Sequence, residues 1–539
     1  MQVSPACLAA ACSIALVVMG IFARPASGQS EPDSPPRPIV IISDLHFGIG
    51  TTPAGVYDNL EDFRWPDALK GFLASVVAKY PGGADLVIAG DLLEMWQHPT
   101  VPCRGCGPDL GCKVDEYERI ADIVARAHAA DLKTLGAFAN NGDNRLFVVP
   151  GNHDAALLHP PVWEIVKKRM AVTDSRRVEL VRSGVWVSTD GSVVVEHGHQ
   201  IAPDVNRYRN WPEVAKGVCE DDGVKTEGFV ERPWGEVFVQ ELYNDVEAEY
   251  PIVDNLVPDS AGASVYRKAR GVWGAAADLA RFIGFNLFQT SIVQKITLDI
   301  SDPARAETWN LTTARARGYR LFADALPADD PIRTRILTDE STEWRDVRRA
   351  LNARAADEQL VSDAEVRALC DQIAARRAER PEEGIESCNP NLALSAARSI
   401  LPLARVLQPH LETRINEFPR MLVFVYGHSH EADYKINVRT SRRTISVLNS
   451  GAFQRLLNLE TFRQKAKARN LAPDVALKEL TLEKDFPACY SAVLVDYDKN
   501  GLPRPVLHQW YMEEKTTSGV LLDGCDRNCG AIPPGCQRP

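Results

Sequence analysis

Short apolar runs rich in β-branched residues recur along the chain, and several end abruptly at polar clusters. Runs of this length and composition predict buried strands. Five of them precede groups of Asp, Asn or His, at residues 38–43, 85–89, 146–150, 192–196 and 421–426. Three later runs also predict strands, at residues 443–448, 492–497 and 506–512. The pattern predicts an α/β fold with polar side chains gathered at the C-terminal ends of its strands, where open α/β sheets place their sites.

The gap of about 230 residues between His197 and His428 is far longer than a connection inside a compact domain. Helical spacing of apolar residues at 263–300, 333–379 and 391–418 predicts a large helical insert or cap over residues 202–418. It would separate two parts of one core, residues 38–201 and 419–512. The apolar stretch 276–296 predicts a core of the insert. The alternative is a lid or groove for an acyl chain or membrane surface.

Composition agrees with a large globular protein. The 539 residues are 45% hydrophobic, enough for one large core and a second unit. The formal net charge of -11 argues against a nucleic-acid scaffold as partner, because a phosphate backbone would be repelled.

The N-terminus has the pattern of an export signal. Residues 6–22 are almost wholly apolar, and small residues follow at 26–28. We expect a signal peptide over residues 1–28, a proline-rich linker over 29–37, and a periplasmic or secreted protein. The alternative is an uncleaved anchor that keeps the protein membrane-associated. Lipid attachment at Cys12 is disfavoured because too little apolar sequence precedes it.

Cysteine usage fits export. Removal of residues 1–28 would leave ten of the 12 cysteines, an even number suited to an oxidising compartment. Cys370 and Cys388 bracket a predicted helix end and are candidates for a mutual disulfide. An alternative for Cys103 and Cys106 is half of a zinc site, although no second pair stands at zinc-finger spacing. Six cysteines in an irregular loop and in the Cys-rich tail, residues 513–539, predict loop disulfides: Cys103, Cys106, Cys112, Cys525, Cys529 and Cys536.

The polar clusters carry the chemistry of a two-metal site. They read S-D-L-H, G-D-L-L-E, G-N-H-D, E-H-G-H and G-H-S-H in chain order. Two divalent cations about 3.5 to 4 Å apart need one bridging oxygen, and Asp91 is the natural bridge. Asp, Asn and His ligands fit Mn, Fe, Zn or Mg. The candidate ligands are Asp44, His46, Asp91, His197, His428 and His430, together with G-N-H-D at residues 151–154.

This order of motifs resembles the calcineurin-like metallophosphoesterase superfamily, over about residues 38–200 and 420–512. The resemblance implies a four-layer α/β/β/α sandwich. It implies that His153 is a catalytic histidine outside the ligand set, oriented by Asp154. It places one metal on Asp44, His46, Asp91 and His430. It places the other on Asp91, Asn152, His197 and His428.

Branch signals are weaker. G-D-L-L-E-M-W and L-N-S-G-A-F, residues 448–453, are similar to the branch that contains UDP-diacylglucosamine hydrolases. Purple acid phosphatases have a tyrosine where this chain has Glu94, and the protein Ser/Thr phosphatase motifs are absent from the sequence. We expect hydrolysis of a phosphomonoester or phosphodiester by a two-metal-bound hydroxide. The alternative is a surface lipid- or protein-binding module with a structural metal centre.

Several polar residues outside the motifs have ordinary explanations. His199 either reaches the substrate phosphate or forms hydrogen bonds within its loop. Asn449 and Ser450 are expected beside the site. Three residues are candidates for lining its entrance: Asp204, Asn206 and Arg207. Five histidines are expected at the surface or in packing: His98, His128, His159, His410 and His508.

Overall fold

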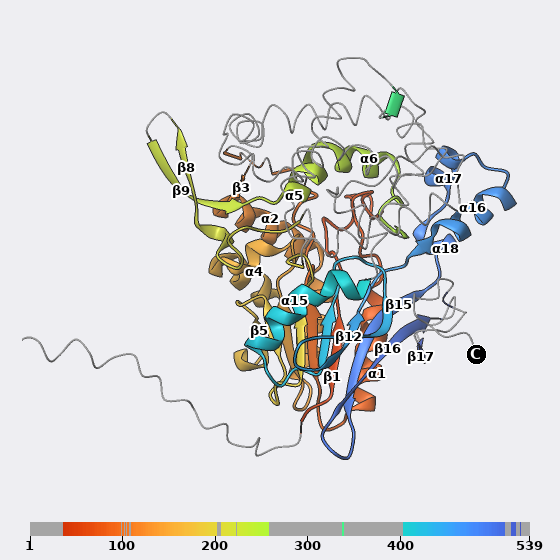
Figure 1. Cartoon of the computed structure of the whole chain (residues 1–539). Helices are drawn as coiled ribbons and strands as arrows, with labels where there is room; N and C mark the ends of the chain where they lie inside the picture. The colour runs from red at the N-terminus through yellow and green to blue at the C-terminus, as the bar shows by residue number, and fades with distance from the viewer. Residues whose placement is uncertain are drawn as a thin grey trace, which may run out of the picture. The chain divides into compact units, whose positions relative to one another are not determined.

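The structure is a computed structural model, and its described residues begin at position 36 (Figure 1). They are 36–98, 100–101, 103, 105–106, 109–201, 206–221, 224–257, 337–338, 403–512, 519–523 and 529. The predicted signal peptide, most of the predicted helical insert and most of the tail lie outside these residues.

One sheet has seven strands in the order β17-β16-β15-β1-β2-β4-β5. Four of its strands run parallel: β1 (Ile39–Ile42), β2 (Asp85–Ala89), β4 (Arg145–Val149) and β5 (Val178–Leu180). The other three add antiparallel strands at the β1 edge: β15 (Cys489–Tyr497), β16 (Pro503–Met512) and β17 (Gly519–Asp523).

A second sheet has five strands in the order β12-β13-β11-β7-β6. Parallel strands form its centre: β7 (Val193–Glu196), β11 (Val423–Tyr426) and β13 (Thr444–Asn449). Antiparallel strands form its edges: β6 (Val185–Val187) and β12 (Asp433–Arg439). The predicted α/β class and all eight predicted strands are confirmed.

The two sheets pack face to face through alternating apolar side chains. Ile39 and Ile41 of β1 join a buried cluster with Val193 and Val425 of the second sheet. Val40, one residue on, belongs to a different cluster on the other face of its sheet. Side chains of a strand alternate between faces, so a fully apolar β1 can serve two cores at once.

Helices cover the outer faces. Four lie against the first sheet: α1 (Pro66–Lys79), α2 (Val114–Ala127), α3 (Ala129–Asn140) and α4 (Pro160–Met170). On the second sheet, Leu407, Leu411 and Ile415 of α15 (Leu403–Glu417) pack with Phe424. Their spacing of four residues puts them on one face of the helix. This helix agrees with the described end of the predicted helical region 391–418.

The described start of the predicted insert is mixed rather than purely helical. A hairpin of β8 (Gly217–Asp221) and β9 (Val224–Glu231) pairs with β3 (Leu110–Lys113). Tyr208, Val230 and Tyr250 belong to the main core cluster. These residues are therefore continuous with the core. The other elements here are α5 (Trp234–Phe238), a π-helical turn (Val239–Tyr243), α6 (Asn244–Glu249) and β10 (Leu256–Val257).

The chain from β13 to β15 completes the described structure. Strand β14 (Leu457–Asn458) pairs with β10, which links this stretch to the start of the predicted insert. Three helices follow: α16 (Leu459–Ala468), α17 (Pro473–Glu479) and α18 (Leu482–Asp485). Within the described residues, the helices are too short or too polar to cross a membrane.

Candidate metal centre

The five polar motifs lie at the C-terminal ends of five parallel-paired strands, as predicted. In the first sheet, Ile42 pairs with Ile88, and Ile88 pairs with Val148, so β1, β2 and β4 end at nearly the same level. In the second sheet, Val425 pairs with Val195. The loops that follow therefore meet at one edge of both sheets.

Asp91 lies at the centre of the candidate ligands. Its Oδ2 atom is 3.0 Å from His197 Nε2 and 3.7 Å from His46 Nε2. Its Oδ1 atom accepts a hydrogen bond from the backbone N–H of His153 at 2.9 Å. The carboxylate is buried and lies between two groups of side chains, as a bridging ligand must.

Asp44, His46 and His430 form the first group. His430 Nε2 is 3.1 Å from His46 Nε2 and 3.6 Å from Asp44 Oδ1. The Asp44 carboxylate also accepts from the backbone N–H of His428, at 3.1 and 3.2 Å from its two oxygens. Asp44 thus anchors the G-H-S-H loop and also contributes a carboxylate oxygen that could bind a metal ion.

Asn152, His197 and His428 form the second group. His197 Nε2 is 2.9 Å from Asn152 Oδ1 and 3.2 Å from His428 Nδ1. The opposite nitrogen, His197 Nδ1, is 2.9 Å from the backbone oxygen of Ala89, which can only accept. The ring therefore donates from Nδ1 and presents the Nε2 lone pair to the group.

The nitrogen and oxygen atoms of the candidate ligands are arranged as cation ligands would be. His46 donates from Nδ1 to Glu94 at 2.9 Å, so its Nε2 lone pair also faces inward. Two imidazole pairs consequently bring ring nitrogens within about 3 Å of each other beside the Asp91 oxygens. Converging lone pairs and carboxylates repel unless a proton or cation lies between them. The seven predicted ligands are all brought together, and they can hold two divalent metal ions.

The strained backbone conformation of the candidate ligands is typical of a functional site. Among described non-glycine residues, positive φ occurs at seven positions, and five are candidate ligands. Such conformations cost of order 1–3 kcal/mol each and cluster at functional sites. The five are Asp44, His46, Asp91, His428 and His430.

Two glycines allow the ligands to approach. Gly90 has a φ of +94°, and a Cβ there would collide with the His197 ring. A Cβ at Gly151 would collide with Asp91 Oδ1. Both positions therefore require glycine, which has no side chain.

Electrostatics favour the protonation states that ligands need at Asp91 and His430, whereas His197 would release a proton on binding a cation. Burial opposes ionisation of Asp91, but His197, His153 and His46 hold its pKa well below the usual value. Burial lowers the pKa of His197, yet Asp91 and Asp44 raise it to about 9. Burial and the neighbouring His46 lower the pKa of His430. Asp91 is thus ionised and His430 neutral near pH 7.

His153 lies beside the ligands with a well-defined partner. Its Nδ1 is 2.5 Å from Glu94 Oε2, and its ring stacks on Trp96 with centroids 3.9 Å apart. Burial would raise the pKa of Glu94, but His153 and His46 lower it to about 2. The ionised Glu94 therefore contacts both imidazoles. The sequence analysis missed Glu94 as a site residue. Its position, three residues after Asp91 in the same loop, was the available signal.

Asp154 has a different position from the one expected. The resemblance predicts that it orients His153, but its carboxylate accepts from three backbone N–H groups. Oδ2 accepts from Leu92 at 2.8 Å and Leu93 at 3.3 Å, and Oδ1 accepts from Gly151 at 2.7 Å. A carboxylate with these partners joins the loops that carry Asp91 and His153. It acts on His153 through the backbone, while Glu94 touches the ring.

The residues expected near the site make ring contacts or hydrogen bonds with the loops around it. His199 is buried and packs edge-on against Trp211, with ring centroids 4.3 Å apart. Ser450 Oγ is 2.7 Å from Ser43 Oγ, and Asn449 Nδ2 donates to Ser429 Oγ at 2.8 Å. Asn449 and Ser450 thus lie beside the site, as predicted, and their hydrogen bonds connect two ligand loops. Asp204 lies outside the described residues. Asn206 and Arg207 are described.

The remaining histidines have partners away from the centre. His128 is buried between Glu61 and Asp131, and His410 contacts Glu196. His159 Nε2 is 3.5 Å from Glu118, and His508 Nδ1 donates to the backbone oxygen of Leu522 at 3.1 Å. These positions agree with the predicted surface or packing roles.

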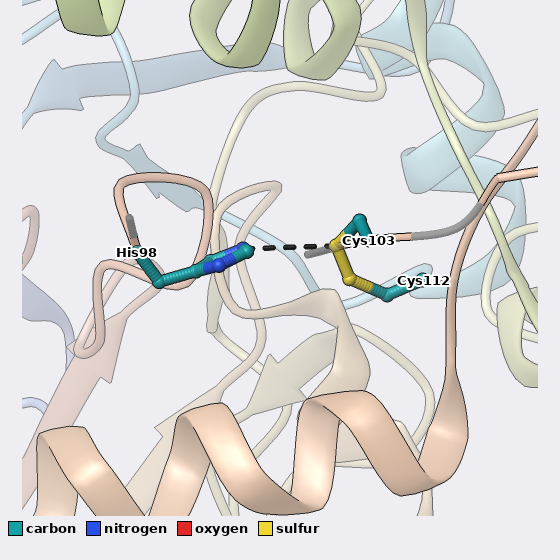
Figure 2. Close-up of side chains that lie close together, drawn as sticks. All are labelled: His98, Cys103 and Cys112. Carbon is teal, nitrogen blue, oxygen red and sulfur yellow. Dashed lines mark hydrogen bonds between the residues drawn. A yellow bond between two sulfur atoms is a disulfide. The ribbon is translucent and has the colours of Figure 1, made fainter. Parts of the chain in front are cut away.

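Three disulfides replace the zinc alternative. The bonds join Cys103 to Cys112, Cys106 to Cys219, and Cys489 to Cys529. Cys103 and Cys106 therefore have different partners. His98 Nε2 lies 3.7 Å from the sulfur of Cys103, beside the disulfide (Figure 2). Sulfurs bound to each other are not thiolate ligands, so the predicted loop disulfides at Cys103, Cys106 and Cys112 are confirmed and the zinc alternative is excluded. Cys370, Cys388, Cys525 and Cys536 lie outside the described residues.

Comparison with known families agrees with this geometry. Residues 37–278 match the model of the calcineurin-like phosphoesterase family, so this part of the chain is similar to that family. Its members are generally metal-dependent phosphoesterases. The matched region contains the first four motifs. No curated protein matches the sequence.

Proposed function

We propose that this protein is a phosphoesterase that uses two divalent metal ions to hydrolyse a phosphomonoester or phosphodiester. The observation that carries the proposal is the position of Asp91, whose carboxylate contacts both His197 and His46 while two further groups of donors converge beside it. When bound, two such ions would activate water and neutralise phosphate oxygens. Mn, Fe, Zn and Mg are all compatible with this donor set.

Exposure indicates where the substrate enters. The side chains of His153 and His430 are 16% and 21% exposed, whereas those of Asp91 and Asp44 are 2% or less. The phosphate therefore approaches over His153 and His430, with the carboxylates beneath. The buried carboxylates would lie on the inner side of the cations, and the partly exposed imidazoles would lie on the side from which the substrate arrives.

His153 is placed to assist the leaving group. The ionised Glu94 carboxylate lies 2.5 Å from Nδ1 and favours a proton on that side of the ring, which leaves Nε2 to hold or transfer a proton. Stacking on Trp96 restricts rotation of the ring. In this proposal His153 protonates or hydrogen-bonds the leaving oxygen, and Glu94 fixes its tautomer and orientation. Asp154 keeps the His153 loop beside Asp91.

We propose only the class of the substrate, a phosphate ester, and export as the location. Export is supported by the apolar run at residues 6–22 and by three disulfides among the described residues, since disulfides persist in oxidising compartments. Likeness to the UDP-diacylglucosamine hydrolase branch rests on two short motifs and would suggest a lipid-linked pyrophosphate. That reaction belongs in the cytoplasm, so we favour a simpler phosphate ester. A lipid or membrane contact through residues 276–296 remains a proposal from sequence.

Turnover of model esters tests the proposal. The full-length secreted protein is assayed with p-nitrophenyl phosphate and bis-p-nitrophenyl phosphate, before and after chelation and after adding Mn²⁺. Activity that chelation removes and Mn²⁺ restores is expected, and the preferred ester separates monoesterase from diesterase. Tight metal binding without turnover of either ester would instead favour the structural metal centre of a binding module.

A further inference from the structure

Polar side chains are directed at one sulfur of the disulfide between Cys103 and Cys112 (Figure 2). His98 Nε2 is 3.7 Å from Cys103 Sγ, and Gln240 Nε2 donates to the same sulfur at 3.9 Å. One nitrogen of His98 and the sulfurs of Cys103 and Cys112 all lie within 4.8 Å of one another. In the described part of the chain, the other two disulfides have no side-chain hydrogen bond at their sulfurs. Packing alone does not require this arrangement.

His98 presents an unprotonated nitrogen to Cys103. Its Nδ1 is 2.9 Å from the backbone oxygen of Val101, which can only accept, so Nδ1 carries the proton. The side chain is buried, and burial lowers the pKa of His98, although the hydrogen bond with Val101 and the charges of Glu94 and Glu116 oppose this. The ring is therefore neutral near pH 7, and the Nε2 lone pair faces the sulfur.

Gln240 is held so that one of its N–H groups faces the same sulfur. Its Nε2 also donates to Glu236 Oε1 at 3.1 Å, and the hydroxyl of Tyr117 donates to that oxygen at 3.1 Å. Glu236 and Tyr117 are both buried. A side-chain amide has two N–H donors, one for each of these partners. A donor fixed in this way stabilises a thiolate at Cys103.

The two cysteines differ in access to solvent. Cys112 is buried, whereas Cys103 is partly exposed. A thiol that reacts with an external molecule must be reachable, while the thiol that then closes the disulfide can lie behind it. Cys103 therefore has the position of an attacking thiol, with a base and a hydrogen-bond donor beside it, and Cys112 has the position of a resolving thiol.

We propose that Cys103 and Cys112 are a redox-active pair that exchanges with small thiols and disulfides of the glutathione class. In the reduced pair, His98 Nε2 takes the proton of Cys103, and the Cys103 thiolate attacks one sulfur of the external disulfide and expels the other as a thiolate. Cys112 then loses its proton and attacks Cys103 Sγ, which closes the protein disulfide and expels the second external thiolate. The protein pair loses two electrons and two protons, and the external disulfide becomes two thiols. The reverse sequence reduces the protein disulfide.

Glutathione reduction tests the proposal directly. The full-length protein is treated with chelator and incubated with reduced glutathione at pH 7, and samples are quenched with acid and alkylated. Peptide mass spectrometry then measures how fast each disulfide opens. The Cys103–Cys112 bond should open at least about tenfold faster than Cys106–Cys219 and Cys489–Cys529. Equal or slower opening would overturn the proposal. Because the metals are removed beforehand, the result is independent of the proposed phosphoesterase activity.

Two cysteine variants assign the attacking and resolving thiols. Cys112→Ser treated with oxidised glutathione should accumulate a mixed disulfide at Cys103, because no thiol remains to resolve it. Cys103→Ser should form little adduct at Cys112, which is buried. An adduct at Cys112 in place of Cys103 would overturn the proposal.

The role of His98 has a signature in the pH profile. His98→Gln should slow exchange about tenfold at pH 7 and much less above about pH 9, where the Cys103 thiol ionises without a base. His159→Gln is the matched control and should exchange like wild type, because His159 pairs with Glu118 away from the cysteines. Equal slowing of His98→Gln at every pH would overturn the role of His98 as a base. Should a variant fail to fold, the comparison of the three disulfides in the wild-type protein still decides.

Discussion

His128 should make the stability of the fold depend on pH in the alkaline range. It is buried, with Nδ1 3.0 Å from Asp131 and Nε2 3.2 Å from Glu61. Burial lowers its pKa, but the two carboxylates outweigh this and raise it to about 9. Glu61 in turn accepts backbone N–H groups of Phe63 and Gly50, so the imidazolium ties a long loop to the junction of α2 and α3.

The magnitude follows from the displaced pKa. At about 1.4 kcal/mol per pH unit, a rise from 6.5 to about 9 corresponds to roughly 3 kcal/mol. Because the folded-state pKa is raised, this stability is fully present below pH 6.5 and is lost as pH rises towards 9. His128→Gln removes the charge and leaves Glu61 buried without its cation. It should therefore destabilise the protein by a few kcal/mol at pH 6 and much less at pH 9.5.

Urea unfolding of the metal-free protein between pH 5.5 and 9.5 measures the effect. Wild type should lose stability across pH 6.5 to 9, and His128→Gln should lose about 3 kcal/mol less over the same range, because both proteins retain the other titrating group, His197. His159→Gln is the matched control, because the His159 side chain is 24% exposed and its pair with Glu118 is worth well under about 1 kcal/mol. Parallel pH curves for wild type and His128→Gln would refute the reasoning.

Three further outcomes are expected. Asp91→Ala should abolish ester hydrolysis and reduce metal content, because the bridging oxygens are lost; full activity in this variant would remove the bridging assignment. His153→Ala should lower turnover by about 10²-fold or more with both metals still bound, measured by kinetics and metal analysis; loss of metal would make His153 a ligand. Replacing Cys106 and Cys219 with serine opens a bond that spans 113 residues and should cost about 2 to 5 kcal/mol in denaturant unfolding; an unchanged midpoint would contradict a stabilising role for this disulfide.

The sequence by itself determined the strands and the ligands of the site. Strands β1, β2, β4, β7 and β11 are short apolar runs whose positions local composition predicts. Parallel strands end at a common edge, so the residues that follow them meet there whatever the rest of the chain does. That is why Asp91 and most of the other candidate ligands could be identified from their motifs, whereas the choice of Asn152 within G-N-H-D came from the family resemblance.

Tertiary structure decided everything that depends on which distant segments meet. The contact of Glu94 with both His46 and His153 and the pairing of Cys106 with Cys219 were not readable from spacing. The hairpin of β8 and β9 lies in a region with weak apolar patterning, and it pairs with β3 more than a hundred residues away. Local patterns encode the conformation of a segment, whereas the partner of a buried charge or thiol depends on chain packing over long separations.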